Sequence, residues 1–456
     1  MMKLPLLSSV FLVTGLAACG GHVGADPAPL VSADSGVSVD SGTLPVEDTM
    51  PAVDTEVPPT PDVAPPLDHG APSKTYPAFP PDAAQLVNQG GDVLTAPVLV
   101  TVTYPGETNV DAYESFGDHL GDTSYWKAIT AEYGVKPTVS GAANHVRMTT
   151  ALPAAMDDSE VDTYVHDRAL DPTKYGWPAP TDQTIYVIYV PSTTAITLQG
   201  NEACSSGVGG YHSSTTVGSL EVAYAIVLQC DYGGHRMSPR TVTASHEVAE
   251  ASLDPHPLTS TPGYRGMDTD HLAWEIFMQR NVENGDLCEI YNDSRYSDTV
   301  DPGFTFNVQR QWSNQSGKAG HNPCAPVSAN PYFNVVALEQ EKVTMNATTL
   351  GGSGRQATKG FHVGVGETKT FAIGFWSDRD TGGPWQIKAT EGSPFGTKTT
   401  VKRLTTSIDR GSGTNGEKAY VTVTVNSVSS TKASVLTIVS TSGSQQFFMP
   451  ILISSQ

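Results

Sequence analysis

The chain has 456 residues, of which 47 are acidic and 26 are basic, so its formal charge is −21. This acidity excludes nucleic acid as the main partner and argues against electrostatic docking on anionic lipid, because both need a basic surface. Hydrophobic residues make up 38% and charged residues 16% of the chain, with 43 glycines and 33 prolines. Such a turn-rich composition is typical of extracellular proteins with much β-structure. No run reaches the roughly 18 apolar residues that a membrane-spanning helix needs.

The N-terminus has the pattern of an export signal. Lys3 precedes a mostly apolar stretch over residues 4–18, which ends in Ala17 and Ala18 before Cys19. A stretch of this length is too short to cross a bilayer but fits a signal peptide. The pattern resembles a bacterial lipoprotein signal over residues 1–19, which implies cleavage before Cys19 and a lipid on its sulfur. We therefore expect a protein of the bacterial cell envelope, anchored in the outer membrane or released, that contacts the membrane only through this lipid. The alternative is an ordinary signal peptide with an incidental cysteine.

The segment after the signal is rich in proline and acid. Residues 20–73 hold ten prolines and nine acidic residues, but no lysine, arginine or aromatic residue. Such a segment cannot bury enough apolar surface to offset the entropy lost on ordering. We expect a disordered tether over residues 20–75.

Strands and helices alternate over residues 76–328, which predicts an α/β or α+β domain. Dense runs of β-formers predict the strands, and apolar periodicity with helix-terminating prolines predicts the helices. Glycine and serine over residues 200–220 predict a long loop. The strands are expected at 97–104, 185–190, 222–229 and 304–312, and the helices at 111–120, 123–133, 157–169 and 239–253.

Residues 329–456 have a different texture. Helical periodicity disappears, and roughly seven short β-runs separated by Gly, Ser, Asn and Asp recur in this part of the chain. Residues 421–425, Val-Thr-Val-Thr-Val, alternate strictly. The pattern predicts a β-sandwich of immunoglobulin-like type without a catalytic cluster, whose role is packing or binding.

The cysteine count fits an exported protein. With Cys19 set aside, four cysteines remain, an even number that predicts two disulfides. Three pairings are possible, and we favour Cys204–Cys230 with Cys288–Cys324 because each then closes a local loop.

One helix carries candidate chemistry. His246 and Glu250 are one turn apart, about 40° around the helix, and fall amid its apolar face. Burying an imidazole and a carboxylate there is costly unless a metal ion or a hydrogen-bonded network partners them. The metal interpretation resembles the zincin helix, His-Glu-x-x-His, with Glu250 in place of the second histidine. Zinc is the expected cofactor, and Glu247 would be the base that activates water. Because the carboxylate of Glu250 is a harder ligand than a histidine, the identity of the metal is less defined.

A metal site needs a third ligand. Glu283 and Asp286 are preferred, because a disulfide at Cys288 would hold their segment rigid. His256 has the spacing of the third histidine in metzincins, although Leu253 replaces the glycine that permits the turn there. Asp254 and Glu275 are further candidates.

Four motifs in order resemble the Exordium/phosphate-induced family and its bacterial secreted relatives. They are residues 246–250 with Asp254-Pro255, residues 283–288, residues 306–314 before Cys324, and Gly210-Tyr211-His212. The resemblance covers roughly residues 92–326 and implies a secreted or wall-associated protein with a zincin-like domain. It implies no settled reaction.

The sequence leaves two functions open. The first is a metal-dependent, endopeptidase-like hydrolase in which residues 222–229 form an edge strand that aligns an extracellular peptide. Tyr211 and His212 would line its cleft, unless His212 is a hydrogen-bonded loop histidine. The second is a non-catalytic surface module that binds a wall polymer or protein. A monomer is expected in either case.

Overall fold

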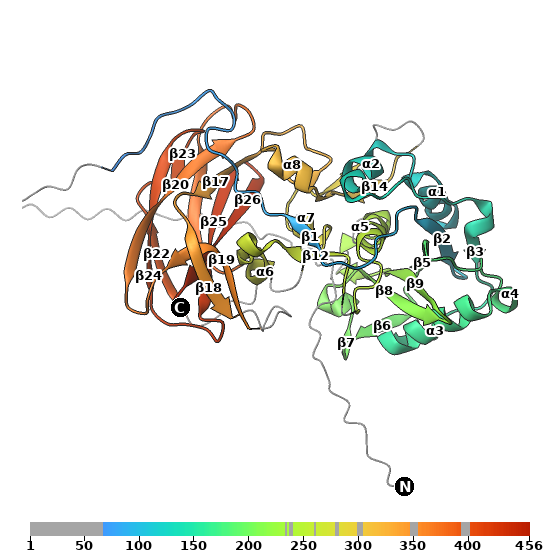
Figure 1. Cartoon of the computed structure of the whole chain (residues 1–456). Coiled ribbons are helices and arrows are strands. Elements are labelled where there is room, and N and C mark those ends of the chain that lie inside the picture. The colour runs from blue at the N-terminus through green and yellow to red at the C-terminus, as the bar shows by residue number, and fades with distance from the viewer. Residues whose placement is uncertain are drawn as a thin grey trace, which may run out of the picture. The chain divides into compact units, whose positions relative to one another are not determined.

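The computed structural model describes residues 67–232, 235–236, 240–259, 261–278, 282–298, 304–346, 354–393 and 402–456. The predicted signal peptide, the lipidation site Cys19 and most of the predicted tether lie outside these residues. The described residues from His69 onward belong to one compact unit. They form a mixed α/β region followed by a β-rich region (Figure 1).

A five-stranded sheet, in the order β3-β2-β5-β9-β8, organises the α/β region. Four strands run parallel, and only β8 runs antiparallel, paired with β9 in a hairpin. The hairpin turns at Gly218, whose φ of +63° is readily adopted only by glycine. The strands are β2 (Val98–Thr103), β3 (His145–Arg147), β5 (Thr184–Tyr189), β8 (Gly210–Val217) and β9 (Leu220–Val227).

Helices cover both faces of this sheet because its strands are apolar on both sides. Alternate residues of β5 belong to different clusters: Ile185 and Val187 pack with α1, α2 and α5, whereas Tyr186 and Ile188 pack with α3. The helices of this region are α1 (Val110–Leu120), α2 (Ser124–Thr130), α3 (Asp158–Leu170), α4 (Pro172–Tyr175) and α5 (Arg240–Leu253). Small strands flank them: β4 (Ala155–Asp157), β6 (Ala195–Leu198), β7 (Asn201–Glu202), β10 (Asp231–Tyr232) and β11 (His235–Arg236).

Two details of the predicted sheet are wrong. Residues 210–217, predicted as part of a long loop, form strand β8. The strand predicted at 222–229, observed as β9, is internal, and β8 is the edge strand beside it. The polar Gly-Tyr-His-Ser-Ser composition concealed β8, whose stability comes from its ladder with β9 and from packing on α5 and α3.

The β-rich region consists of two facing sheets with strand orders β17-β20-β24-β22 and β18-β19-β26-β25-β21-β23. Aromatic rings meet between the sheets: Phe361 stacks on Phe371 at 4.0 Å, and Phe375 lies 5.4 Å from Trp385. This arrangement is a β-sandwich. Its strands are β17 (Phe333–Ala337), β18 (Glu341–Asn346), β19 (Arg355–His362), β20 (Thr368–Ser377), β21 (Trp385–Glu391), β22 (Leu404–Ile408), β23 (Ser412–Gly413), β24 (Lys418–Val425), β25 (Ala433–Ser442) and β26 (Gln445–Ser454).

Strand β1 and the short elements between residues 264 and 325 connect the two regions. Helix α6 contacts β25 and β26, and Phe277 of α6 lies 5.6 Å from Phe448. Strand β12 pairs with β1 from the start of the domain. These elements are β1 (Leu86–Asn88), β12 (Tyr264–Met267), α6 (Ala273–Met278), α7 (Asp286–Glu289), β13 (Arg295–Ser297), β14 (Asn307–Gln309), β15 (Gln311–Trp312), α8 (Asn314–Lys318) and β16 (Cys324–Ala325).

The chain before β1 packs against the sandwich. Lys418 N–H donates to His69 O at 2.7 Å, and Ser73 N–H donates to Asn415 O at 2.7 Å. The Asn415 side-chain amide donates to the Ser73 and Thr75 carbonyls at 2.9 and 2.8 Å. Residues 69–75, which composition places in the tether, are therefore held by the C-terminal sheets, because backbone hydrogen bonding does not require the apolar side chains they lack.

Both predicted disulfides are confirmed. Cys204 is bonded to Cys230 and Cys288 to Cys324, the pairing in which each bridge closes a local loop. No helix among the described residues has the length and apolar character needed to cross a membrane.

Candidate metal centre

Helix α5 runs through the interior, and all of its residues are buried. Its apolar side packs on the sheet through Val248, Ala249 and Leu253. Its polar side faces β8, the loop before α7, and strands β14 and β15. His246 and Glu250 are therefore enclosed, as the helix pattern predicts, and Glu247 is enclosed as well, with 0% exposure each.

A first group of donors brings together three residues singled out from the sequence. Ligand atoms of His246, Glu250 and Asp286 lie within 4.8 Å of one another. His246 Nε2 is 3.0 Å from Glu250 Oε1 and 3.9 Å from Asp286 Oδ1. The fold thus places the predicted third-ligand segment beside the predicted helix pair.

The surroundings of this first group are rich in hydrogen-bond donors. Gln309 Nε2 lies 2.8 Å from His246 Nδ1 and also donates to Gly285 O at 2.9 Å. Glu250 Oε1 accepts from the backbone N–H groups of Gly285 and Asp286 at 3.1 and 3.2 Å. One oxygen of Glu250 is therefore occupied by the backbone of the loop that leads into α7.

A second group shares Glu250 and includes His212 of β8. His212 Nδ1 lies 3.6 Å from Glu247 Oε2 and 3.6 Å from Glu250 Oε2. These three ligand atoms lie within 4.8 Å of one another. Among the described residues, none of the three atoms has a hydrogen-bond partner, and neither does Glu247 Oε1.

The other nitrogen of His212 is anchored. His212 Nε2 donates to the backbone carbonyl of Asp254 at 3.1 Å and lies 3.4 Å from Glu283 Oε1. Arg265 Nη1 lies 3.7 Å from Asp254 Oδ2 and is the buried cation on this side of the cluster. Glu283 is thus beside His212, on the ring edge opposite Glu247 and Glu250.

Burial dominates the pKa values of three carboxyl groups in this cluster, those of Glu247, Glu250 and Asp254. It raises the pKa of Glu247, raises that of Glu250 to about 8, and raises that of Asp254 to about 6. Glu283 is the exception: although burial opposes ionisation, His212 and Arg265 lower its pKa to about 2. Burial alone would lower the pKa of His212, but the surrounding carboxylates hold it well above its ordinary value. The carboxyl groups outnumber the bases, so the cluster favours an added positive charge.

Three other predicted residues lie elsewhere. His256 Nε2 is 3.8 Å from Asp92 Oδ2 and belongs to neither donor group. Tyr211 belongs to the cluster on the α3 face of the sheet, opposite His212, because successive side chains of a strand point to opposite faces. Glu275 accepts from Met267 N–H at 2.6 Å and is likewise outside both groups.

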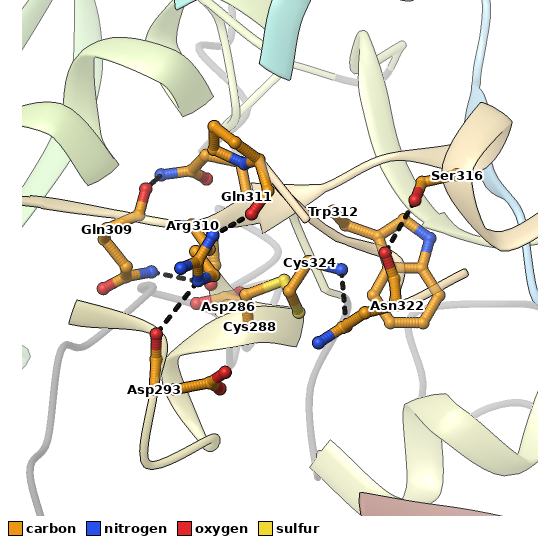
Figure 2. Close-up of a disulfide and its surroundings, with 12 residues drawn as sticks. Asp286, Cys288, Asp293, Gln309, Arg310, Gln311, Trp312, Ser316, Asn322 and Cys324 are labelled. Carbon is orange, nitrogen blue, oxygen red and sulfur yellow. Dashed lines mark hydrogen bonds between the residues drawn. A yellow bond between two sulfur atoms is a disulfide. The ribbon is translucent and has the colours of Figure 1, made fainter. Parts of the chain in front are cut away.

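The Cys288–Cys324 disulfide fixes the loop that faces α5. Figure 2 shows Asp286 near this bridge, with Gln309 and Gln311 beside it. The bridge joins α7, which begins at Asp286, to β16. Because β16 pairs with β15, the disulfide links Asp286 to the strand that follows β14.

Sequence reasoning missed Gly285 and Gln309. A Cβ at Gly285 would lie 2.7 Å from Glu250 Oε1, 2.7 Å from His246 Nδ1 and 2.8 Å from Gln311 Oε1. Only glycine lets the loop approach this closely. Gly285 can be seen in the sequence Glu283-Asn284-Gly285-Asp286, but the need for a glycine there comes from a long-range contact with α5.

Comparisons with known proteins add little. No family model matches the chain, and no curated protein matches it. Among solved structures, domains 4 and 5 of the S-layer protein SbsC match with a TM-score of 0.15 and 16% identity, covering 26% of this chain and 54% of that one. Domains 1–6 of SbsC match with a TM-score of 0.17 and 17% identity, covering 28% of this chain and 14% of that one. Similarity at this level establishes neither fold nor function.

Proposed function

We propose that the α/β region is a zincin-like, metal-dependent hydrolase domain displayed on the bacterial cell envelope. One observation carries this proposal: two groups of potential metal ligands meet at Glu250, in the interior, on a helix with the sequence His-Glu-x-x-Glu. The sheet beside that helix, four parallel strands with one antiparallel edge strand, is compatible with a zincin-like domain.

The donor set fits a divalent cation. Imidazole nitrogen and carboxylate oxygen are ligands for zinc, and the carboxylate excess also suits harder metals. Glu247 has two buried oxygens without a hydrogen-bond partner among the described residues, and His212 Nδ1 and Glu250 Oε2 each lack one. Burying such groups without compensation costs several kcal/mol or more, so a cation among them accounts for their placement.

A bound divalent cation would polarise a scissile carbonyl and acidify water. In the arrangement that the helix motif predicts, His246 and Glu250 hold the cation with Asp286, while Glu247 takes the proton from water. Glu283, the other predicted ligand, would instead support His212.

The proposed substrate is an extracellular peptide or another cell-wall polymer. Strand β8 is an edge strand, so it can present backbone groups to an extended chain. His212 on β8 contacts the α5 carboxylates directly, which would place a peptide bound along β8 next to the cluster.

Metal analysis and a peptide-hydrolysis screen on the purified full-length protein test this function. We expect one equivalent of a divalent metal and hydrolysis that a chelator stops. Glu250→Gln should lower metal affinity by more than about 100-fold. Loss of a group that only supports a ligand costs about 10- to 100-fold, so loss of a ligand should cost more. Glu221→Gln, on β9 and outside the cluster, is the matched control. A wild-type protein that stays metal-free after exposure to Zn²⁺ or Mn²⁺ would exclude the proposal.

Burial favours a second candidate, a non-catalytic envelope module with a structural metal. His212, Glu247, Glu250 and Asp286 are each at most 3% exposed, whereas a catalytic site keeps a position open to water or substrate. This candidate predicts stoichiometric metal and chelator-sensitive thermal stability without hydrolysis of any peptide in the screen.

A further inference from the structure

We infer that the cation is held by His212 Nδ1, Glu247 Oε2 and Glu250 Oε2, and not by the group that contains His246. This inference rests on the proposed metal binding and identifies its ligands. The ligands come from the edge strand β8 and from one face of α5.

The spacing of these atoms fits a common cation. Zinc bonds to nitrogen and carboxylate oxygen are about 2.0–2.2 Å long, so ligand atoms around a tetrahedral ion lie about 3.4 Å apart. His212 Nδ1 lies 3.6 Å from each of the two carboxylate oxygens. A hydrogen bond from Nδ1 to either carboxylate does not explain this placement, because an N···O separation of 3.6 Å is too long for one.

The protonation of His212 also fits. Its Nε2 must carry a proton, because it faces the Asp254 carbonyl, which can only accept. A neutral ring then has its lone pair on Nδ1, directed at the two carboxylates. A metal-ligating histidine is usually oriented by such a hydrogen bond from its other nitrogen to a backbone carbonyl.

In His246 the proton and the lone pair are on the opposite nitrogens from those in His212. Gln309 Nε2 donates to Gly285 O and lies 2.8 Å from His246 Nδ1, which must then accept. The proton of a neutral His246 is therefore on Nε2, the nitrogen that faces Glu250 Oε1. Reversing the Gln309 amide would set its oxygen against the Gly285 carbonyl at 2.9 Å, where two acceptors repel.

The two carboxylate oxygens of Glu250 also have different surroundings. Oε1 accepts two backbone N–H groups from Gly285 and Asp286. Oε2 has no hydrogen-bond partner among the described residues and faces His212. The His246 side of the cluster is thus a hydrogen-bonded support, and the His212 side holds the lone pairs that need a cation. Glu247 is then a metal ligand and not the water-activating base that the helix motif predicts.

The test measures Zn²⁺ and Co²⁺ affinity in the full-length protein and in His212→Gln, Glu247→Gln and His246→Gln. His119→Gln, an exposed histidine on α1, is the matched control. We expect His212→Gln and Glu247→Gln each to weaken binding by more than about 100-fold, and His246→Gln by about 10- to 100-fold, as for a supporting residue. Thermal unfolding of each metal-free variant checks folding.

The outcomes separate the inference from the proposed function. Metal retained in His212→Gln or Glu247→Gln but lost in His246→Gln overturns the inference and leaves the proposed hydrolase standing. No metal in the wild type overturns both. If the variants do not fold or all lose metal, a crystal of the Zn²⁺-loaded wild type with anomalous diffraction decides. A peak bonded to His212 Nδ1 supports the inference, and a peak at His246 Nε2 rejects it.

Discussion

The interiors of the two regions differ in what they bury. In the described part of the sandwich, the core is built from aromatic and aliphatic side chains, and the buried polar residues are Asn, Ser and Thr. The carboxylate of Asp378 is also 0% exposed, but it pairs with the half-exposed Arg379 and not with other buried charges. In the α/β region, helix α5 and its neighbours bury carboxyl groups, histidines and Arg265 together. Apolar burial explains the sandwich by itself. The charged cluster opposes folding unless it is compensated, so it indicates a function that the sandwich core does not share.

The largest effect on stability is expected from the sandwich core. Phe375 is fully buried, next to Trp385. Phe375→Ala should lower the free energy of unfolding by about 3–5 kcal/mol. Metal affinity of the folded protein should not change, since Phe375 is outside both donor groups. Urea unfolding and metal titration measure both quantities, and a parallel loss of metal affinity would show that the regions are not independent.

A smaller loss of stability, combined with loss of metal, is expected from the α/β interior. Gly285→Ala places a methyl group within 2.7 Å of Glu250 Oε1. Overpacking of this kind costs about 1–3 kcal/mol, and the displaced carboxylate should also weaken metal binding. Gly383→Ala is the control, because a Cβ there meets nothing within 4 Å. Equal metal affinity in Gly285→Ala and Gly383→Ala would contradict the placement of the loop.

The contact between the regions should respond to pH. His271 lies 2.8 Å from Asp268 Oδ1 and 3.2 Å from Asp82 Oδ1, and Asp82 also pairs with Lys359 of β19 at 2.5 Å. Although burial opposes it, these carboxylates raise the pKa of His271 to about 9. A raised histidine pKa stabilises the folded state fully below its unfolded value of about 6.5 and less as pH rises towards 9.

Stability should therefore fall by about 3 kcal/mol between pH 6 and pH 9.5, beyond any change in His271→Gln. Despite the burial of Asp82, His271 and Lys359 depress its pKa. The stability that the Asp82 carboxylate contributes is therefore lost at low pH, as pH falls below about 4. Urea midpoints of the two proteins across this range provide the test. Parallel curves for the wild type and His271→Gln would reject the assignment.

The smallest effect is expected at His256, the metzincin-like third ligand considered from the sequence. His256→Gln should leave metal affinity within about twofold, because His256 contacts Asp92 and neither donor group includes it. Metal titration checks this, and a loss comparable to that of Glu250→Gln would restore His256 as a ligand.

Local signals in the sequence predicted much of this molecule. Helix α5 ends at Leu253, before Pro255, as predicted, and both disulfides follow from cysteine spacing and export. Asp286 was considered because its segment is next to a bridged cysteine, and its carboxylate lies 3.9 Å from His246 Nε2. Strand β8 was missed because its polar, glycine-containing sequence has no β-run signal, and its ladder with β9 is a tertiary property. The different surroundings of His212 and His246, on which the proposed ligand set rests, were also beyond sequence patterns, because they depend on contacts with Asp254 O and the Gln309 amide.

The pairing of residues 69–75 with the end of the sandwich has a consequence for the order of events during biogenesis. Gly70 bridges to Glu417, and Ser73 bonds to Asn415, so early residues complete their contacts with residues near the other end of the chain. Contacts this distant form late, because a long loop must close first. In the proposed export of the chain through a translocation pore, N-terminus first, these early residues would have no native partners until β24 has followed them out. Any chaperone that escorts the newly exported chain would find this stretch exposed for nearly the whole of its passage.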